Sequence, residues 1–306
     1  MRGKDFVSVL DAKGELDAIV QSATDLKQRF LAGDRDETLA GKTLALVFEK
    51  SSTRTRVSFE VAMSQLGGRS IFLNPQDMQM GRGETIPDTA RTLSRYVDCI
   101  AYRAFRHDRV LELAENSSVP VINALDDLEH PCQALADMMT IVERRENPEV
   151  LRLTYVGDGN NVCNSLILAC SLMRIDITVA CPGGYEPDDR IVREAKALAS
   201  QGGSKCQIVQ DPRAAVRNAD VIYTDVWVSM GDEEEARQRL KAFADYQVNS
   251  DLLSLASPDC IVMHCLPAHR GQEITDDVID GPRSIVFDQA ENRLHAQKAL
   301  LIDLLR

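Results

Sequence analysis

Strand-length apolar segments alternate with helical patterns along the whole 306-residue chain, and this alternation limits the folds that it can adopt. Between these segments apolar residues recur three or four positions apart, as in residues 16–30. We expect strands at residues 43–48, 69–73, 98–102, 119–123, 151–156, 176–180, 206–209, 221–224, 260–264 and 284–287. Because repeated strand–helix units form parallel sheets with helices on both faces, the sequence predicts an α/β fold.

The chain is long enough for two domains, and one segment marks their boundary. Residues 144–148 (Arg-Arg-Glu-Asn-Pro) follow a long helical pattern and precede a new strand. We therefore expect two parallel-sheet α/β domains, at residues 1–146 and 147–288, with a cleft between them. The final helix, residues 289–306, is expected to pack back on the first domain and brace it.

Charge and cysteine content exclude several classes of protein. The net charge is −12 and no block of Lys or Arg occurs, which argues against nucleic acid and against an anionic membrane as partners. The acidic residues near the start of the sequence (Asp11, Glu15, Asp17) are not those expected of a signal peptide. No apolar run approaches the length of a membrane span. The eight cysteines include no C-x-x-C pair, so we expect reduced thiols and a cytoplasmic protein.

Residues 51–56 (Ser-Ser-Thr-Arg-Thr-Arg) join the predicted strand 43–48 to a predicted helix at 57–66. The free N–H groups and the dipole at a helix start attract anions, and arginine matches phosphate oxygens with two parallel hydrogen bonds. A capped helix with a solvated basic first turn is the alternative. A cap needs only one hydroxyl, however, and arginines in a first turn oppose the dipole. The segment therefore predicts an anion site.

Two further positions in the first half are candidates for the same site. His130 precedes Pro131 at the start of a predicted helix, where the dipole favours a neutral imidazole that can donate to a carbonyl oxygen. Arg103 follows the predicted strand 98–102, at the edge where ligands of parallel sheets bind. The alternatives, a helix-capping histidine and a surface arginine, remain open from these residues alone.

The second half begins with Gly157-Asp158-Gly159-Asn160-Asn161-Val162 after a predicted strand, which is part of a dinucleotide-binding motif. Val162 replaces the third glycine, and the next strand ends at Cys181 where a ribose-binding acid is expected. Both differences disfavour a nicotinamide dehydrogenase. A tight turn that presents asparagine side chains to a small polar ligand fits better.

Two loops in the second half follow predicted strands. Residues 225–231 (Asp-Val-Trp-Val-Ser-Met-Gly) have the composition of a loop that closes on a ligand, or of a loop that packs on its own domain. Residues 264–271 place Cys265 at a strand end, where it is either a buried thiol or half of a nucleophilic Cys–His pair. His264, Cys265 and His269 are too few ligands for a structural zinc site, so we expect no metal.

Together these motifs resemble the aspartate/ornithine carbamoyltransferase family, and its ornithine-specific members most closely. The resemblance runs through nearly the whole chain. The segments Ser-Met-Gly at 229–231 and His-Cys-Leu-Pro at 264–267 are typical of the ornithine-specific members. The other segments that carry it are residues 52–56, 79–84, 102–103, 130–133, 157–161, 225–228 and 291–293.

The resemblance implies a site for each substrate. The carbamoyl phosphate site would consist of Ser52, Thr53, Arg54, Thr55, Gln79, Arg103, His130, Gln133, Cys265, Leu266 and Arg293. The ornithine site would consist of Asn161, Asp225, Ser229 and Met230. The catalytic residues would be Arg103, His130, Asp225 and Cys265.

The implied reaction is transfer of the carbamoyl group to the δ-amine of L-ornithine, which gives L-citrulline and phosphate without a cofactor. Gln79 would reach into the site of a neighbouring subunit, so a homotrimer or a multiple of trimers is implied. The alternative is the same chemistry on another amine, namely aspartate, putrescine or N-acetylornithine.

Overall fold

The computed structural model describes residues 1, 3–74, 78–145, 150–228 and 235–306. They form two compact units, one comprising Met1–Met139 and Glu291–Arg306 and the other Thr140–Ala290. Each unit has one parallel sheet with helices packed against it, which confirms the predicted α/β fold. No helix among the described residues is both long enough and apolar enough to cross a membrane.

The first unit contains a four-stranded sheet with the order β2-β1-β3-β4. Its strands are β1 (Thr43–Phe48), β2 (Arg69–Leu73), β3 (Cys99–Arg103) and β4 (Val121–Leu125). Its helical segments are η1 (Val9–Ala12), α1 (Leu16–Leu31), α2 (Thr53–Gln65), η3 (Gln79–Gly81), α3 (Ile86–Leu93), α4 (His107–Asn116), the first part of α5 (Pro131–Arg144) and, from Glu291, α12 (Val286–Leu305).

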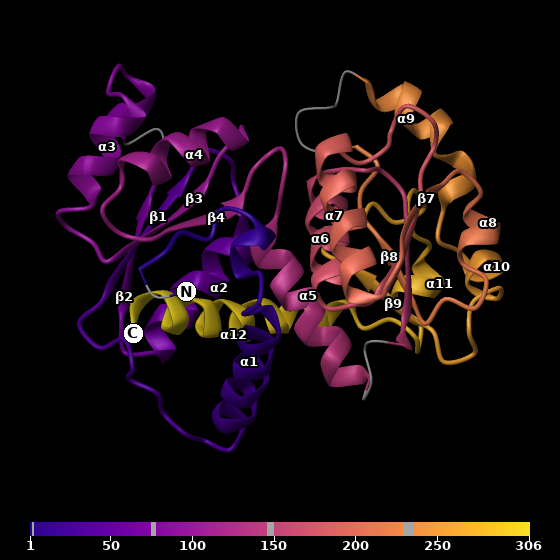
Figure 1. Ribbon diagram of the computed structural model, residues 1–306, viewed down its shortest axis with the longest axis horizontal. Helices are drawn as coiled ribbons and strands as arrows, with labels where there is room; N and C mark the ends of the chain where they lie inside the picture. The colour runs from indigo at the N-terminus through magenta and orange to yellow at the C-terminus, as the bar shows by residue number, and fades with distance from the viewer. Residues whose placement is uncertain (2, 75–77, 146–149, 229–234) are drawn as a thin grey trace. The chain divides into compact units, whose positions relative to one another are not determined.

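Side chains on the two faces of this sheet have different partners, because successive residues of a strand point to opposite faces. Val47 and Tyr102 pack in a buried apolar cluster with α3 and α4. Arg103, the next residue of β3, belongs to the opposite face, where Arg293 of α12 donates a hydrogen bond to Thr55 of α2. Figure 1 shows α3 and α4 above this sheet, and α2 and α12 below it.

Side-chain hydrogen bonds hold α12 against the first unit at several positions from Asn292 onward. Lys298 Nζ donates to Gln65 Oε1 of α2 (3.2 Å), and Lys27 Nζ of α1 donates to Asn292 Oδ1 (2.7 Å). Most residues of the helix beyond Asn292 are buried. The terminal helix therefore braces the first unit, as the predicted fold requires.

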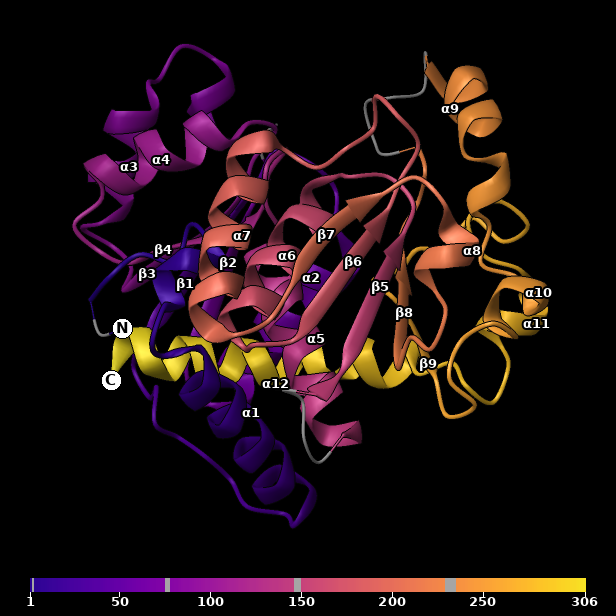
Figure 2. The ribbon, with the colours of Figure 1, turned by 45° about the vertical axis from the view of Figure 1, so that its right-hand side comes forward.

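The second unit contains a five-stranded sheet with the order β7-β6-β5-β8-β9. Its strands are β5 (Arg152–Val156), β6 (Asp176–Ala180), β7 (Cys206–Val209), β8 (Val221–Thr224) and β9 (Ile261–His264). Its remaining helical segments are α6 (Asn161–Leu172), α7 (Asp189–Gly202), α8 (Pro212–Ala215), α9 (Ala236–Ala242), η6 (Ala244–Tyr246), α10 (Ser250–Leu253) and α11 (Asp276–Ile279). Figure 2 shows α6 and α7 on one side of this sheet and α8 on the other.

Each sheet has one point at which the order of its strands reverses. In the first unit this point lies between β1 and β3, and in the second between β5 and β8. Connections leave the two strands in opposite directions there, so a crevice forms beyond their carboxyl ends, and ligands of open α/β sheets bind in it. Ser52 and Arg103 lie at the first point, and Asp158 and Asp225 lie at the second.

The predicted strand at 284–287 is wrong. Ser284 forms only an isolated bridge with Val262, and α12 already begins at Val286. Buried residues recur there at helical spacing, whereas Phe287 is exposed. A short apolar run cannot distinguish a strand from a buried helical turn.

The predicted position of Arg103 is also wrong by one residue. Arg103 is the last residue of β3 and does not follow the strand.

The nine other predicted strands correspond to β1–β9, with ends that differ by at most two residues. The domain boundary expected at 146/147 falls among residues outside the described part, and it stays a prediction. The division between the two compact units lies within α5, after Met139.

Candidate functional site

Three arginines and one histidine converge beyond the carboxyl end of the first sheet. Arg54 lies in the first turn of α2, Arg103 ends β3, Arg293 lies on α12, and His130 directly precedes α5. The positive charges of Arg54, Arg103 and Arg293 all act on His130, and those of Arg54 and Arg293 act on Arg103. Residues far apart in the sequence therefore form one cationic cluster, which we call the arginine cluster (Arg54, Arg103 and Arg293).

Arg293 links three helices of the first unit. Its Nη1 donates to Gln133 Oε1 (2.7 Å), and its Nη2 donates to Thr55 Oγ1 (3.0 Å). Gln133 Nε2 in turn donates to Asp137 Oδ1 (2.8 Å). Both ends of the Gln133 amide are thus fixed, and the planar guanidinium of Arg293 is held in one orientation.

Two arginines of this cluster, Arg54 and Arg103, have no acidic partner among the residues that the structure describes. Within the described part of the chain, the side chains of Arg54 and Arg103 form no ion pair, and the buried Arg103 Nε has no hydrogen-bond partner. Arg103 is 7 % exposed, and burial together with the charges of Arg293 and Arg54 lowers its pKa to about 10. Burying a cation without an opposite charge is unfavourable, so Arg103 favours the binding of an anion beside it.

His130 is neutral at neutral pH. Burial, and then the charges of Arg293, Arg103 and Arg54, hold its pKa well below the usual 6.5. Its backbone carbonyl accepts from the N–H of Gln133 (3.0 Å), which fixes it at the start of α5. A neutral imidazole beside a bound anion can donate a hydrogen bond without adding a positive charge that would repel the arginines.

Ser52, Thr53 and Thr55 belong to the start of α2. Ser52 is the N-cap, and its hydroxyl accepts from the Thr55 N–H at 3.4 Å. Thr55 is buried against Arg293, whereas Thr53 is exposed. Gln79 lies elsewhere in the first unit, in η3, and its side chain is exposed. The structure thus ties Thr55 and Gln133 to Arg293, places Ser52 and Thr53 at the start of the helix that carries Arg54, and places Gln79 on a different element.

Asp225 is the centre of the candidate site in the second unit. It follows β8, is 5 % exposed, and its Oδ1 lies 3.0 Å from Cys265 Sγ, which follows β9. Asn160 Nδ2 donates to Asp225 Oδ2 (2.8 Å). The Asn160 side chain also caps α6 through the N–H groups of Val162 and Cys163. A carboxylate, a thiol and an amide therefore meet where β5, β8 and β9 end.

His264 and Glu273 fix the segment that carries Cys265. The two side chains are fully buried, and His264 Nε2 lies 3.1 Å from Glu273 Oε1. His264 Nδ1 accepts from the backbone N–H of Leu266 (2.9 Å). Leu266 has φ of 57°, a strained conformation for a residue with a side chain, and strain of this kind is concentrated at functional sites.

One potential metal-binding group occurs among the described residues. Asp225, His264 and Cys265 each offer one ligand atom, and these atoms lie within 4.8 Å of one another. Both ring nitrogens of His264 are already engaged, however, with Glu273 and Leu266. A metal would have to replace those contacts, so the arrangement suits a hydrogen-bonded network better than a metal centre.

Arg239 holds the beginning of the loop that follows β8. Its Nη1 donates to Asp158 Oδ2 (2.9 Å) and to the backbone carbonyl of Trp227 (3.0 Å), and its guanidinium lies over the ring of Tyr185. The indole ring of Trp227 stacks on Phe243. The start of this loop therefore packs on its own unit.

Some predicted residues of the second unit are only partly accounted for. Asn161 begins α6 and is half-buried, but Asn160 is the neighbour that contacts Asp225. Ser229 and Met230 lie outside the described residues. Asn160 could have been found as the helix cap after Gly-Asp-Gly. Nothing in the sequence indicated Glu273, because it pairs with His264 only through the path of a loop.

Comparison with known families matches both halves of the chain. Residues 4–143 match the model of the "Aspartate/ornithine carbamoyltransferase, carbamoyl-P binding domain", and residues 149–304 match that of the "Asp/Orn binding domain" of the same family. An ornithine carbamoyltransferase of Methanoculleus marisnigri is 58% identical over 303 residues, which are 99% of this chain and 97% of that protein. A catabolic ornithine carbamoyltransferase of Thermoplasma volcanium is 53% identical over 305 residues (100% and 99%).

Solved structures agree with this result. The ornithine carbamoyltransferase of Pyrococcus furiosus superposes with a TM-score of 0.97 at 53% identity and covers 99% of this chain and 97% of its own. An anabolic ornithine carbamoyltransferase of Campylobacter jejuni gives a TM-score of 0.92 at 38% identity (98% and 99%).

Proposed function

Because the chain belongs to the aspartate/ornithine carbamoyltransferase family, we propose that it transfers the carbamoyl group of carbamoyl phosphate to the δ-amine of L-ornithine. The products are L-citrulline and phosphate, and the reaction belongs to arginine metabolism. The observation that supports this most strongly is the arginine cluster beside a neutral His130. Such a cluster suits a substrate that combines a phosphate with a carbonyl group.

Carbamoyl phosphate would bind first, on the domain formed by residues 1–146 and 289–306. The start of α2 (Ser52 to Thr55) and the arginine cluster would hold the phosphate. His130 would donate to the carbonyl oxygen, and Gln133 would face the amide. As the reaction proceeds, negative charge grows on the carbonyl oxygen and on the departing phosphate, and the fixed cations stabilise both.

Ornithine would bind on the domain formed by residues 147–288. Asp225 and Cys265 would orient the δ-amine, Asn161, Ser229 and Met230 would hold the rest of the amino acid, and Cys265 and Leu266 would also line the carbamoyl phosphate site. A free amine of this type has a pKa of about 10.4, and burial lowers the pKa of such amines. The amine nitrogen forms a bond to the carbonyl carbon, the carbon–oxygen bond to phosphate breaks, and the amine proton leaves with phosphate.

The assembly and location belong to the same proposal. Gln79 is exposed, so its side chain is available to complete the site of a neighbouring subunit in a homotrimer or a multiple of trimers. The free cysteines among the described residues and the net charge of −12 support a cytoplasmic enzyme without nucleic acid or membrane partners.

Citrulline formation tests the proposed reaction. The purified protein is given carbamoyl phosphate with ornithine, and parallel assays contain aspartate, putrescine or N-acetylornithine. We expect turnover with ornithine and a kcat/KM at least about a hundredfold lower with the other amines, because each of them lacks a group of ornithine that the site would pair: aspartate lacks the δ-amine, putrescine the carboxylate and N-acetylornithine the free α-amine. Turnover with another amine alone would contradict the acceptor, and no turnover with any amine would contradict the function.

A further inference from the structure

The loop before His130 is organised by one buried carboxylate. Asp126 is fully buried, and its Oδ1 accepts from the backbone N–H groups of Leu128 (2.8 Å) and Glu129 (2.7 Å). The backbone N–H of Asp126 donates to the carbonyl of Glu129 (3.0 Å), which closes the turn. Because His130 is the next residue, the conformation of this turn sets where His130 enters the arginine cluster.

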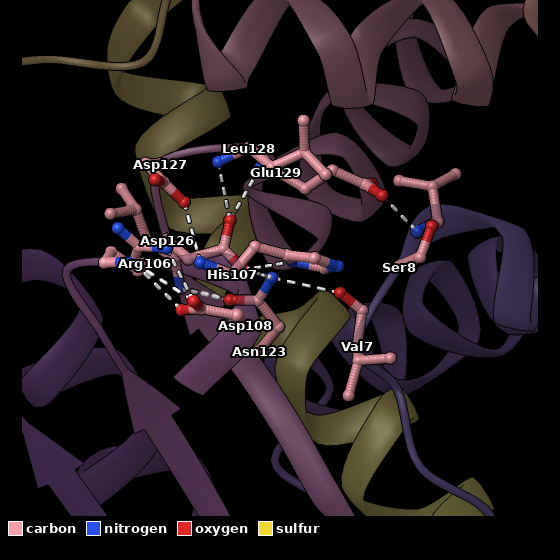
Figure 3. A network of polar contacts seen from close by, with 12 residues as sticks. Val7, Ser8, Arg106, His107, Asp108, Asn123, Asp126, Asp127, Leu128 and Glu129 are labelled. Atoms are coloured by element: carbon pink, nitrogen blue, oxygen red, sulfur yellow. Dashed lines mark hydrogen bonds and ion pairs between the residues drawn. The ribbon is translucent and has the colours of Figure 1, made fainter. Parts of the chain in front are cut away.

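The second oxygen of Asp126 connects the turn to two other elements, as Figure 3 shows. Asn123 Nδ2 of β4 donates to Asp126 Oδ2 (2.8 Å) and also to the backbone carbonyl of Val7 (3.0 Å). His107 Nδ1, at the start of α4, lies 2.6 Å from the same Asp126 oxygen. The backbone N–H of His107 donates to Asp127 Oδ1 (2.7 Å). His107 therefore contacts two successive residues of the turn.

A further contact holds the end of this turn from the opposite direction. Glu129 is buried, and its Oε2 accepts from the backbone N–H of Val9 (3.1 Å). The turn from Asp126 to Glu129 is thus held between the N-terminal segment and the first residue of α4. Removal of one of these supports leaves the backbone of the turn, and not the arginine cluster itself, free to shift.

Charge strengthens the contact between His107 and the turn. Its imidazole contacts the carboxylate of Asp126, and the negative charges of Asp127 and Glu129 also act on it. The hydrogen bond to Asp126 and these charges raise the pKa of His107, in opposition to burial. The side chain is 20 % exposed, so it exchanges protons with solvent. A protonated His107 can form a charge-assisted bond, which is shorter and stronger than a neutral one.

We propose that His107 is a positioning residue for His130 in the proposed reaction: through Asp126 it holds the turn that sets the imidazole of His130 beside the carbamoyl group. His107 touches no reacting atom in this scheme. The proposal rests on the proposed function for its kinetic consequence, but the link between His107 and His130 is a property of the folded protein and can be measured without substrate.

Two substitutions of His107 distinguish the loss of its contact with Asp126 from other effects of replacing the side chain. His107→Leu removes the donor, whereas His107→Asn places an amide N–H near the position of Nδ1. In His107→Leu we expect kcat to fall by at least about tenfold, since an ångström of displacement can cost about a hundredfold. Its affinity for inorganic phosphate should stay within about twofold, because phosphate requires the arginine cluster. His107→Asn should recover most of kcat.

A spectroscopic measurement follows His130 directly. The chain has only five histidines, so ring signals of histidine-labelled protein can be assigned with single variants such as His130→Asn. We expect the His130 signals to move in His107→Leu and to return in His107→Asn. In the wild type they should move as His107 titrates, which provides a test even when His107→Leu does not fold.

Arg106→Ala is the matched control, because Arg106 precedes His107 but pairs on the surface with Asp108. It should change neither kcat nor the His130 signals. The proposal would be overturned if His107→Leu had the kcat of the wild type. It would also be overturned if the His130 signals changed neither with this substitution nor with the titration of His107. A wild-type protein without carbamoyltransferase activity would overturn the function instead, while the His130 signals would still decide the inference.

Discussion

At the scale of single residues, the surroundings of three histidines determine whether the pKa of each is lowered or raised. His130 and His295 are buried near cations, and their pKa values are lowered, that of His295 to about 4. His107 faces carboxylates, and its pKa is raised. The site therefore contains an imidazole that stays neutral. Because a histidine with a lowered pKa binds its proton more readily in the unfolded chain, low pH destabilises the fold.

This loss of stability at low pH can be measured at His295. Its folded pKa lies below its value in the unfolded chain, about 6.5, so stability is complete above pH 6.5 and is lost as the pH falls toward 4. Within that window the free energy of unfolding falls by at most about 1.4 kcal/mol per pH unit through His295. Urea unfolding at several pH values should show a shallower loss of stability in His295→Gln than in the wild type. Equal slopes would contradict the assignment.

At the scale of elements, the turn after β5 depends on a glycine for space. A Cβ on Gly159 would lie 2.2 Å from the backbone nitrogen of Pro187, which cannot move aside as a flexible side chain can. We expect Gly159→Ala to lower the free energy of unfolding by at least about 2 kcal/mol, and to displace Asn160 from Asp225.

Gly183→Ala is the matched control, because its Cβ would meet only the end of the Gln210 side chain, at 3.2 Å. Denaturant unfolding should show a loss well below that of Gly159→Ala. Equal losses for the two variants would mean that the close backbone approach at Gly159 does not matter.

The elements also show where sequence patterns were sufficient. Local periodicity predicted the strands from β1 to β9, because each is a short apolar run between helices. It failed at residues 284–287, where Ile285 and Val286 are buried in a helical turn. The fold follows from the repeated strand–helix pattern, whereas the ends of elements depend on tertiary contacts.

At the scale of the whole molecule, the site residues differ in how far the sequence could predict them. Arg54 and Asp225 come shortly after predicted strands, and because ligands of parallel sheets bind beyond the carboxyl ends of the strands, these positions already indicated a ligand. Arg293 and His130 lie over 160 residues apart, and only the fold brings them together. Asn160 had a local signal as the cap of α6, whereas Glu273 and His107 act through side-chain contacts that leave no local pattern.

The central claim is that the arginine cluster holds the phosphate of carbamoyl phosphate, and calorimetric titration tests it most directly. Carbamoyl phosphate is titrated into the wild type and into Arg103→Met, with thermal unfolding measured on both. Removal of a charge-assisted anion contact of about 3 kcal/mol should weaken binding by about a hundredfold, while the variant remains folded. A folded Arg103→Met protein with wild-type affinity would contradict the claim.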